Sequence, residues 1–250
     1  MAKNKNKTRV VALIGGTGFD SLAQFQVSHR EVVRTPYGDP SGILKSGTLD
    51  GKSLVFLPRH GRDHKIPPHK VNYRANIWSL KSMGVTEIVA FAAVGGISDN
   101  LRDGTIVIPD QLIDYTWGRE HTFFDGDSSR LEHIDFTYPY SSRLRQDLIQ
   151  AASKARVRVV SKGCYGATQG PRLETAAEID RLENDGADVV GMTGMPEAAL
   201  ARELGLEYVC LAIVVNAAAG RSDQLISMEA ISNNLEKGSK RALRVLKKFL

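Results

Sequence analysis

The amino-acid sequence predicts a single α/β domain with a mixed, largely parallel central sheet flanked by helices. Short apolar runs recur along the 250 residues, each closed by Gly, Pro, Asp or Asn. Runs of this length without polar alternation are typical of strands covered on both faces. Helical patterns lie between several of the runs, which favours parallel pairing. Neither a repeat nor a linker-like segment divides the chain, so we expect one domain over residues 1–250, with 1–7 as a flexible N-terminal arm.

The expected elements follow one another along the chain. Strands are expected at residues 10–14, 54–57, 87–94, 105–108, 188–190 and 208–215. Helices are expected at 71–83, at 175–182, at 196–204 and from about 227, the last with Met228, Ile231, Leu235, Ala242, Val245 and Leu246 facing inward. Pro196 suits a first helical turn because it lacks an N–H. Residues 119–140 are rich in polar and aromatic side chains and are expected to form a long, ordered, functional loop.

Composition and charge narrow the class of protein. The chain is 42% hydrophobic, 24% charged and 7% aromatic, as soluble globular proteins are. The net charge is +5, but its densest basic cluster, near the C-terminal end, alternates with apolar residues at helical spacing, which favours a solvated helix face over a nucleic-acid groove. The two cysteines form no C-x-x-C pair, and no run resembles a signal peptide or a membrane span. We therefore expect a reduced, cytoplasmic protein that binds neither nucleic acid nor membranes.

A glycine-rich turn follows the first expected strand. The strand at 10–14 runs into Gly15-Gly16-Thr17-Gly18, where an α/β sheet can present backbone N–H groups to an anion. The turn lacks the last glycine of a dinucleotide fingerprint, and the chain has no Walker A loop. The segment is either a short phosphate nest with a hydroxyl at Thr17 or only a tight turn.

Arg59 and His60 follow the second expected strand. Ligands of open α/β sheets lie beyond the carboxyl ends of strands, where Arg59 could hold a phosphate through two parallel N–H bonds. The alternative is an Arg-His pair in a surface turn. His60, His64 and His69 lack the H-E-x-x-H spacing of a zinc site, and two prolines before His69 prevent a shared helix. We therefore expect no metal.

Two further segments point to the same edge of the sheet. The strand at 87–94 ends in Gly95-Gly96, and Met192-Thr193 precedes the helix expected from Pro196. Three strand ends and one helix start thus converge, and convergence favours an anion site more than any one motif does. The chain has no G-x-S-x-G elbow, so a protein nucleophile is not indicated.

Several long motifs carry a family resemblance over nearly the whole chain, in order. They are the turn at 15–18 and the segments 59–64, 70–78, 170–175 and 186–193. In these motifs the chain resembles the family of trimeric purine nucleoside phosphorylases and methylthioadenosine phosphorylases. The resemblance implies a single α/β domain, a homotrimer with sites near its interfaces, and cleavage of a purine nucleoside by inorganic phosphate as co-substrate, with no metal or organic cofactor.

The same resemblance implies roles at the phosphate and sugar. Thr17, Arg59, His60 and Thr193 would bind phosphate, helped by the backbone of Ala92 and Ala93, and Met192 would lie against the sugar. Methylthioadenosine phosphorylases carry a hydroxyl residue where this chain has Ala92, which removes one side-chain phosphate contact.

The base is expected to be a 6-oxopurine. The adenine-specific branch carries a Thr-Asp-x-Asp motif where this chain reads Val215-Asn216-Ala217-Ala218. An Asn216 amide can donate to O6 and N7 of a 6-oxopurine, and Ala218 replaces the second carboxylate. Glu174 stands where the inosine/guanosine branch has a glutamate that accepts from N1–H. Asn216, Glu174 and His60 are thus the expected catalytic residues.

The sugar end is expected to be apolar. By alignment Met228 occupies the position of a histidine that binds the 5′-hydroxyl in the inosine/guanosine branch, and a thioether suits a 5′-methylthio group. The alternative makes Met228 a core residue of the last helix. His133 matches a residue that covers the substrate from the neighbouring subunit, or is a plain loop histidine.

The expected substrate is therefore methylthioinosine, cleaved to hypoxanthine and 5-methylthioribose 1-phosphate in purine and methylthio salvage. Within the class, the alternatives are inosine or guanosine and methylthioadenosine. From another class, the chain would be a non-catalytic purine sensor or a nucleic-acid-binding protein, with ligand affinity but without phosphate-dependent cleavage.

Overall fold

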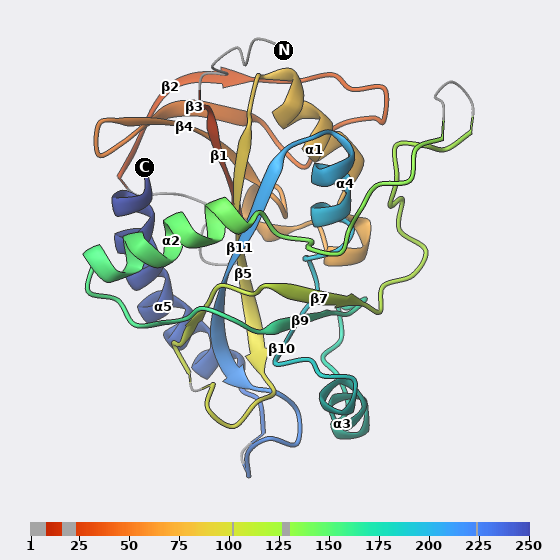
Figure 1. Cartoon of the computed structure of the whole chain (residues 1–250), viewed down its shortest axis with the longest axis vertical. Helices are drawn as coiled ribbons and strands as arrows, with labels where there is room; N and C mark the ends of the chain where they lie inside the picture. Colours follow the sequence, from red (N-terminus) through yellow and green to blue (C-terminus); the bar gives the residue numbers. More distant parts are fainter. Residues whose placement is uncertain (1–8, 17–23, 102, 127–130, 224) are drawn as a thin grey trace, which may run out of the picture.

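Two long strands form the axis of the molecule. The computed structural model describes residues 9–16, 24–101, 103–126, 131–223 and 225–250. In Figure 1, β5 (Glu87–Gly96) and β11 (Glu207–Ala217) run side by side through the centre, and they pair in parallel from Glu87 opposite Glu207 onward. The flexible arm expected at residues 1–7 lies outside the described residues.

The remaining strands extend the sheet on both sides of this axis. They are β1 (Val11–Gly15), β2 (Phe25–Glu31), β3 (Leu44–Leu49), β4 (Lys52–Pro58), β6 (Ile106–Val107), β7 (Gln111–Asp114), β8 (Val159–Val160), β9 (Cys164–Ala167) and β10 (Val189–Gly191). The main path runs β2-β3-β4-β1-β5-β10-β9-β7, with β11, β6 and β8 branching from β5. The sheet is mixed, and its central pairs β4-β1, β1-β5 and β5-β11 are parallel.

Strand β5 changes its partner along one edge. β1 pairs with its first part, as far as Ala90, and β10 pairs with its last two residues, Gly95 and Gly96. Because β11 pairs along the opposite edge, residues 92–94 are left without a strand partner on the first edge among the described strands. An open stretch of backbone of this kind, where neighbouring strands part, is where α/β sheets bind ligands.

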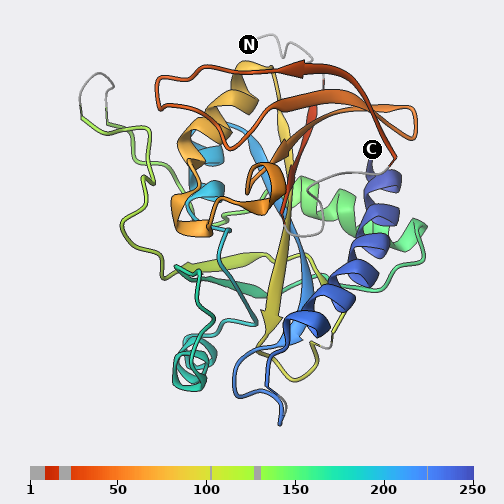
Figure 2. The ribbon, with the colours of Figure 1, turned by 180° about the vertical axis from the view of Figure 1, so that it is seen from behind.

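Helices cover both faces of the axis. They are α1 (Tyr73–Ser82), α2 (Ser142–Lys154), α3 (Ala176–Asn184), α4 (Glu197–Glu203) and α5 (Met228–Phe249), with short 3-10 turns at Arg62–His64 and Pro68–Lys70. Alternate residues of β11 face opposite ways: Tyr208 and Cys210 join the core with α1 and α4, whereas Val209 and Leu211 join the core with α2 and α5. Figures 1 and 2 show these two helix pairs on opposite sides. This double cover is why β11 is apolar without alternation.

The predicted fold class is confirmed, and every expected strand and helix has a counterpart within a few residues. Three features differ. Strands β2, β3, β7, β8 and β9 were not expected; β2, for example, is largely exposed and has no apolar run. Helix α2 was not expected either, although Leu144, Leu148, Ala151 and Ala152 recur at helical spacing after the capping residue Ser141, a signal that the sequence did contain. Finally, Met228 points outward at the start of α5.

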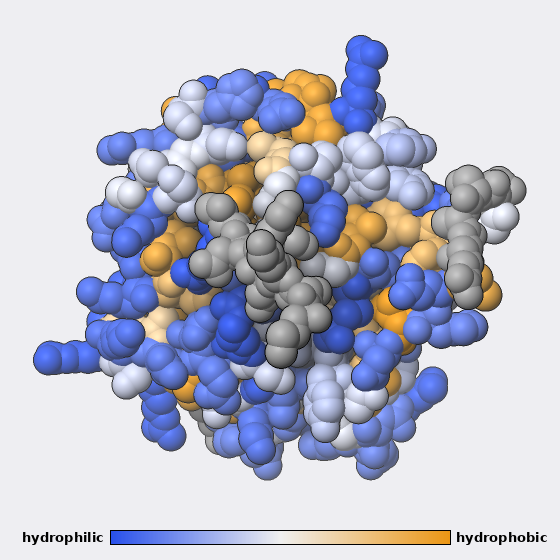
Figure 3. All heavy atoms as spheres, turned by 45° about the horizontal axis from the view of Figure 1, so that its top comes forward, coloured by the Kyte–Doolittle hydropathy of each residue, from blue (hydrophilic) through white to orange (hydrophobic). Residues whose placement is uncertain are grey.

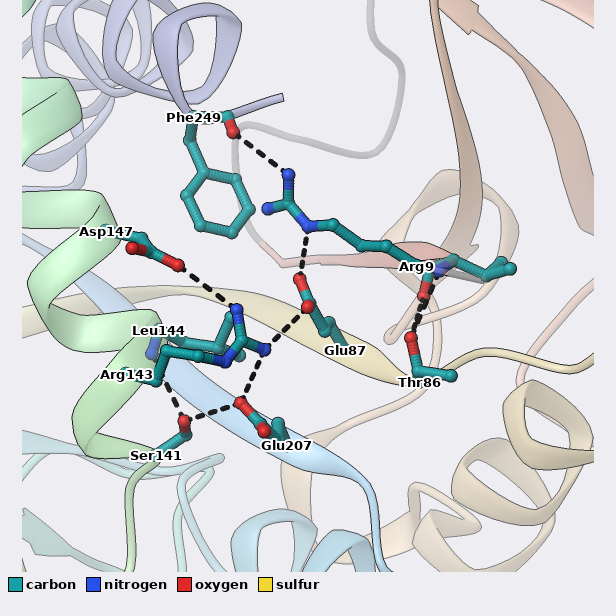
Figure 4. A network of polar contacts seen from close by, with 10 residues as sticks. Arg9, Thr86, Glu87, Ser141, Arg143, Leu144, Asp147, Glu207 and Phe249 are labelled. Carbon is teal, nitrogen blue, oxygen red and sulfur yellow. Dashed lines mark hydrogen bonds and ion pairs between the residues drawn. The ribbon is translucent and has the colours of Figure 1, made fainter. Parts of the chain in front are cut away.

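A network of charged residues lies where β5 and β11 begin, at the other end of these strands from the open stretch of β5. Glu87 accepts hydrogen bonds from Arg9 at 2.8 Å and from Arg143 at 2.6 Å, and Arg143 also donates to Glu207 at 2.7 Å. Figure 4 shows how β5, β11, α2 and the segment before β1 meet there, with Arg9 also reaching the carbonyl of Phe249 in α5 at 3.5 Å. The network ties both described ends of the chain to the sheet.

The surface offers one more observation on the class of protein. Figure 3 shows a face on which hydrophilic residues surround small, separate hydrophobic groups. Among the residues that the structure describes, no helix is long and apolar enough to cross a membrane.

Candidate active site

Most of the predicted site residues line one pocket of about 160 Å³ at the open stretch of β5. They are Arg59, His60, Ala92, Ala93, Glu174, Met192, Thr193, Asn216 and Ala218. They come from the ends of β4, β10 and β11, from the interior of β5 and from the loop before α3, so segments that the sequence predicted to converge do line one pocket. A larger neighbouring hollow of about 520 Å³ shares Glu174 but has no phosphate-site residue in its lining. We therefore regard the smaller pocket as the site.

Arg59 is held differently from the expectation. Its side chain is 1% exposed, and its Nε and Nη2 donate to the two oxygens of buried Glu197, each at 2.7 Å. Burial alone would lower the pKa of Arg59, but the Glu197 carboxylate outweighs it, so the pKa lies above its ordinary value. The two-bond grip predicted for phosphate is thus taken by a protein carboxylate, because a buried guanidinium needs a partner. Only the terminal nitrogens have N–H bonds left for a ligand.

Gly16 makes room for this arrangement. A Cβ at Gly16 would lie 2.7 Å from Nη1 of Arg59 and 3.0 Å from the carbonyl oxygen of Phe91. Nη1 donates to that same carbonyl at 2.8 Å. The second glycine of the turn therefore allows the Arg59 side chain and the backbone of β5 to lie close to it. Thr17, the predicted hydroxyl ligand, lies outside the described residues.

His60 is oriented by its own loop. Its Nδ1 lies 2.8 Å from the carbonyl oxygen of Ile66, so in a neutral ring Nδ1 carries the proton. His60 is 4% exposed and its ring centroid lies 4.2 Å from that of His64. Among the described residues, no group of three His, Cys, Asp or Glu side chains is placed to hold a metal ion.

The loop carrying Met192 and Thr193 rests on Tyr165. The buried Tyr165 hydroxyl accepts from the backbone N–H of Thr193 at 3.4 Å. A Cβ on Gly191 or Gly194 would lie 2.2 or 3.0 Å from the Tyr165 ring or its hydroxyl, so these glycines let the loop sit directly on the ring. Burial raises the pKa of Tyr165 to about 12, which keeps its hydroxyl neutral.

Arg119 anchors the same loop from the other side. It is 8% exposed, and Nη1 donates to the carbonyls of Met192 and Met195 at 2.9 and 2.6 Å. Nη2 donates to the carbonyls of Thr168 and Gln169. One guanidinium therefore fixes two loops that border the pocket. This role was not predicted, because a lone arginine inside a polar loop carries no sequence signal.

Two predicted residues, Glu174 and Asn216, add polar side chains to the pocket lining. The Glu174 carboxylate accepts a hydrogen bond from the Thr168 hydroxyl at 2.7 Å, which orients it. Asn216 donates one amide N–H to the carbonyl of Ala217 at 2.7 Å, which leaves its second N–H and its oxygen for a ligand. Glu174 thus offers the pocket a hydrogen-bond acceptor, and Asn216 offers it a donor. Thr168 was not foreseen as the orienting group.

The two residues predicted for the sugar end lie elsewhere. Met228 is 74% exposed and does not belong to the pocket lining, so it neither faces the pocket nor joins the core in this chain. Ile226 and Ile231, from the same segment, do line the pocket. Apolar side chains of this segment therefore do line the pocket, but they belong to Ile226 and Ile231 instead of the predicted Met228. His133 is exposed and also lies outside the lining, in the long loop before α2.

Comparison with known proteins places this geometry in context. The family model of the phosphorylase superfamily matches residues 10–250. A protein of Xanthomonas campestris pv. campestris named "Probable S-methyl-5'-thioinosine phosphorylase" is 54% identical over 92% of both chains. One of the same name from Pseudomonas syringae pv. tomato is 51% identical over 96% of this chain and 98% of its own.

A solved structure has the same fold. Methylthioadenosine phosphorylase from Schistosoma mansoni in complex with adenine superimposes with a TM-score of 0.92. It is 35% identical, over 96% of this chain and 90% of its own.

Proposed function

Because this chain belongs to the phosphorylase superfamily and is a nucleoside phosphorylase, a pentosyltransferase, we propose that its substrate is methylthioinosine. The reaction joins phosphate to the sugar and releases hypoxanthine, giving 5-methylthioribose 1-phosphate in purine and methylthio salvage. The observation that carries the proposal is one pocket whose lining combines the guanidinium of Arg59, the polar side chains of Glu174 and Asn216, and the apolar side chains of Ile226 and Ile231.

At the phosphate end, the pocket supplies donors rather than a nucleophile of its own. Arg59, His60, Thr193 and the open backbone at Ala92 and Ala93 face the same space. Phosphate held there attacks the sugar carbon, and its charge stabilises the positive charge that develops on the sugar. Positioning and preorganised donors therefore supply the rate, with no covalent enzyme intermediate.

At the base end, the leaving purine takes up electrons. The N–H of Asn216 donates to N7 or O6 as negative charge develops there, and Glu174 accepts from N1–H, which a 6-oxopurine bears and adenine lacks. Thr168 supports this role by fixing the Glu174 carboxylate. The absence of a carboxylate at Ala218 disfavours a 6-amino group.

At the sugar end, two isoleucines favour an apolar 5′ substituent over a hydroxyl. A buried hydroxyl without a hydrogen-bond partner costs free energy, whereas a methylthio group gains from contact with Ile226 and Ile231. The names of the two relatives described above, which are 54% and 51% identical to this chain, support the same substrate.

The assembly and location belong to the same proposal. We infer a homotrimer in which His133 of one subunit covers the pocket of its neighbour, consistent with its exposed position in this chain. Cys164 and Cys210 are free thiols, which suits a reducing cytoplasm.

The test is a comparison of four nucleosides. Base release from methylthioinosine, inosine, methylthioadenosine and adenosine is measured with and without phosphate. We expect phosphate-dependent release of hypoxanthine, with the highest kcat/KM for methylthioinosine. Faster cleavage of inosine or of methylthioadenosine would reject the substrate, and binding without cleavage would favour a sensor.

A further inference from the structure

A buried ion pair lies directly behind the phosphate end of the pocket. Arg59, at the end of β4, and Glu197, in the first turn of α4, are 138 residues apart, and their side chains are 1% and 0% exposed. Two hydrogen bonds of 2.7 Å join them in parallel. Such charge-assisted pairs set direction as well as distance.

The donors of Arg59 show how closely its direction is set. A guanidinium has five N–H bonds, of which two here donate to Glu197 and one, on Nη1, donates to Phe91 at the open edge of β5. The space left by Gly16 confines Nη1 from the other side. The guanidinium is therefore held between β1, β5 and α4, with its remaining N–H bonds on the terminal nitrogens.

Glu197 is itself held from β11. The Tyr208 hydroxyl donates to Oε1 at 2.8 Å, and Tyr208 is 3% exposed. The carboxylate thus accepts three hydrogen bonds, which offsets the cost of burying its charge. Neither residue lines the pocket, so neither is placed to touch a substrate there.

We propose that Glu197 is a positioning residue for phosphorolysis, acting through Arg59. It fixes the direction of the guanidinium and compensates its charge, so the pocket offers phosphate an oriented donor instead of a mobile cation. The proposal rests on the proposed function, which assigns Arg59 to phosphate. Because an oriented nucleophile lowers the barrier of the chemical step, loss of Glu197 affects the phosphate-dependent rate more than nucleoside affinity.

The chain supplies a matched control at the other end of the same strand. Glu87 is also a nearly buried carboxylate, 6% exposed, that accepts from Arg9 and Arg143 (Figure 4). It stands five positions before Ala92 on β5, which is about 17 Å along an extended strand. Glu87→Gln therefore disturbs a similar ion pair without touching the pocket.

The experiment compares Glu197→Gln, Glu197→Asp and Glu87→Gln with the wild type. Glutamine turns an amide N–H toward a donor of Arg59, whereas aspartate keeps the charge but is one methylene too short for the same geometry. The measurements are kcat, KM for phosphate and for methylthioinosine, Tm, and the Kd of inorganic phosphate by calorimetry.

We expect kcat/KM for phosphate to fall at least about 10-fold in Glu197→Gln, since small misplacements of a reacting group cost up to about 100-fold. The KM for methylthioinosine should stay within about twofold, because positioning acts on the other substrate. Glu197→Asp should fall between, and Glu87→Gln should lose stability only.

A purely structural role gives a different result. If Glu197→Gln loses stability as Glu87→Gln does but keeps the wild-type kcat/KM and Kd for phosphate, the proposal is overturned. If Glu197→Gln does not fold, Glu197→Asp carries the same comparison. A wild type without phosphate-dependent cleavage would reject the proposed function, while weaker phosphate binding in Glu197→Gln would still support Glu197.

Discussion

At Gly16, the absence of one carbon atom allows a buried arginine to reach the sheet edge. Nη1 of Arg59 and the carbonyl of Phe91 both occupy the space where a Cβ would project. Glycine-rich turns are usually explained by backbone freedom, but here the requirement is close approach of a neighbouring side chain. The lack of a side chain at Gly16 thus allows Arg59 to take its position in the pocket lining.

Gly16→Ala should therefore displace Arg59 from its position. We expect kcat/KM for phosphate to fall on the order of 100-fold, because a shift near 1 Å at a reacting group costs about that much. Steady-state kinetics with varied phosphate measures the effect.

Gly51→Ala is the control for Gly16→Ala. Gly51 has φ of +77°, and an added Cβ meets no atom within 4 Å. This variant should lose stability through backbone strain and keep its activity. Equal kinetic constants for the two alanine variants would contradict the steric argument.

In the proposed function, Asn216 selects the base by the direction of its hydrogen bonds. Asn216→Asp replaces the donor to O6 with an acceptor that suits a 6-amino group. We expect the ratio of kcat/KM for methylthioadenosine to that for methylthioinosine to rise about 10-fold or more. An unchanged ratio, with base release as the assay, would place specificity elsewhere.

At the scale of elements, α5 packs against β11, and Gly238 lies at this contact. Gly238 is buried in the helix, and a Cβ there would lie 2.3 Å from Cγ2 of Ile213. Alanine has the better helix propensity, by about 1 kcal/mol. Two carbon atoms that are not bonded cannot lie 2.3 Å apart. The close packing against Ile213 therefore outweighs the higher helix propensity of alanine at this position.

Gly238→Ala should therefore lower stability, by about 1–2 kcal/mol after overpacking is set against propensity. Thermal unfolding should show Tm lower by roughly 2–8 °C. In an Ile213→Ala background, where the opposing methyl is gone, the same change should raise Tm. A lower Tm in both backgrounds would mean that the contact with Ile213 is not the cause.

At the scale of the whole molecule, buried tyrosines surround the Arg59–Glu197 pair. Burial raises the pKa of Tyr73, Tyr140, Tyr165 and Tyr208. The folded protein therefore keeps these protons at pH values where the unfolded chain, with pKa near 10, has lost them. The contribution of these tyrosines to the free energy of unfolding is fully present below about pH 10. It falls as the pH rises further, by up to about 1.4 kcal/mol per pH unit for each tyrosine.

Tyr140→Phe tests this alkaline dependence. The Tyr140 hydroxyl is buried and has no hydrogen-bond partner among the described residues, so phenylalanine removes an unsatisfied group without leaving a cavity. We expect a gain of about 1–3 kcal/mol near pH 7 and a shallower loss of Tm between pH 9 and 11.

Tyr138→Phe is the control for the pH series, because Tyr138 is 66% exposed. It should leave both Tm and its pH dependence unchanged. If Tyr140→Phe lowers Tm at pH 7, the hydroxyl has a partner that the described contacts lack.

Much of this protein follows from the sequence alone. Apolar strands without alternation determine a doubly covered sheet, since each face must be buried, and the ends of those strands carry the residues that line the pocket. Arg59, His60, Glu174 and Asn216 could be singled out because polar residues at strand ends and in long linked motifs are visible as patterns. The fold class and the family were predictable for that reason.

Other features were decided only by the tertiary structure. Glu197 meets Arg59 across a long stretch of chain and is held by Tyr208, and no local pattern predicts such contacts. The partner change along β5 opens the backbone at 92–94, which depends on the register of β1, β10 and β11 against β5. Met228 and Ile226 are two residues apart, and the entry of the chain into α5 decides which of them lines the pocket. Sequence determines which residues must be buried; only packing determines which of them meet.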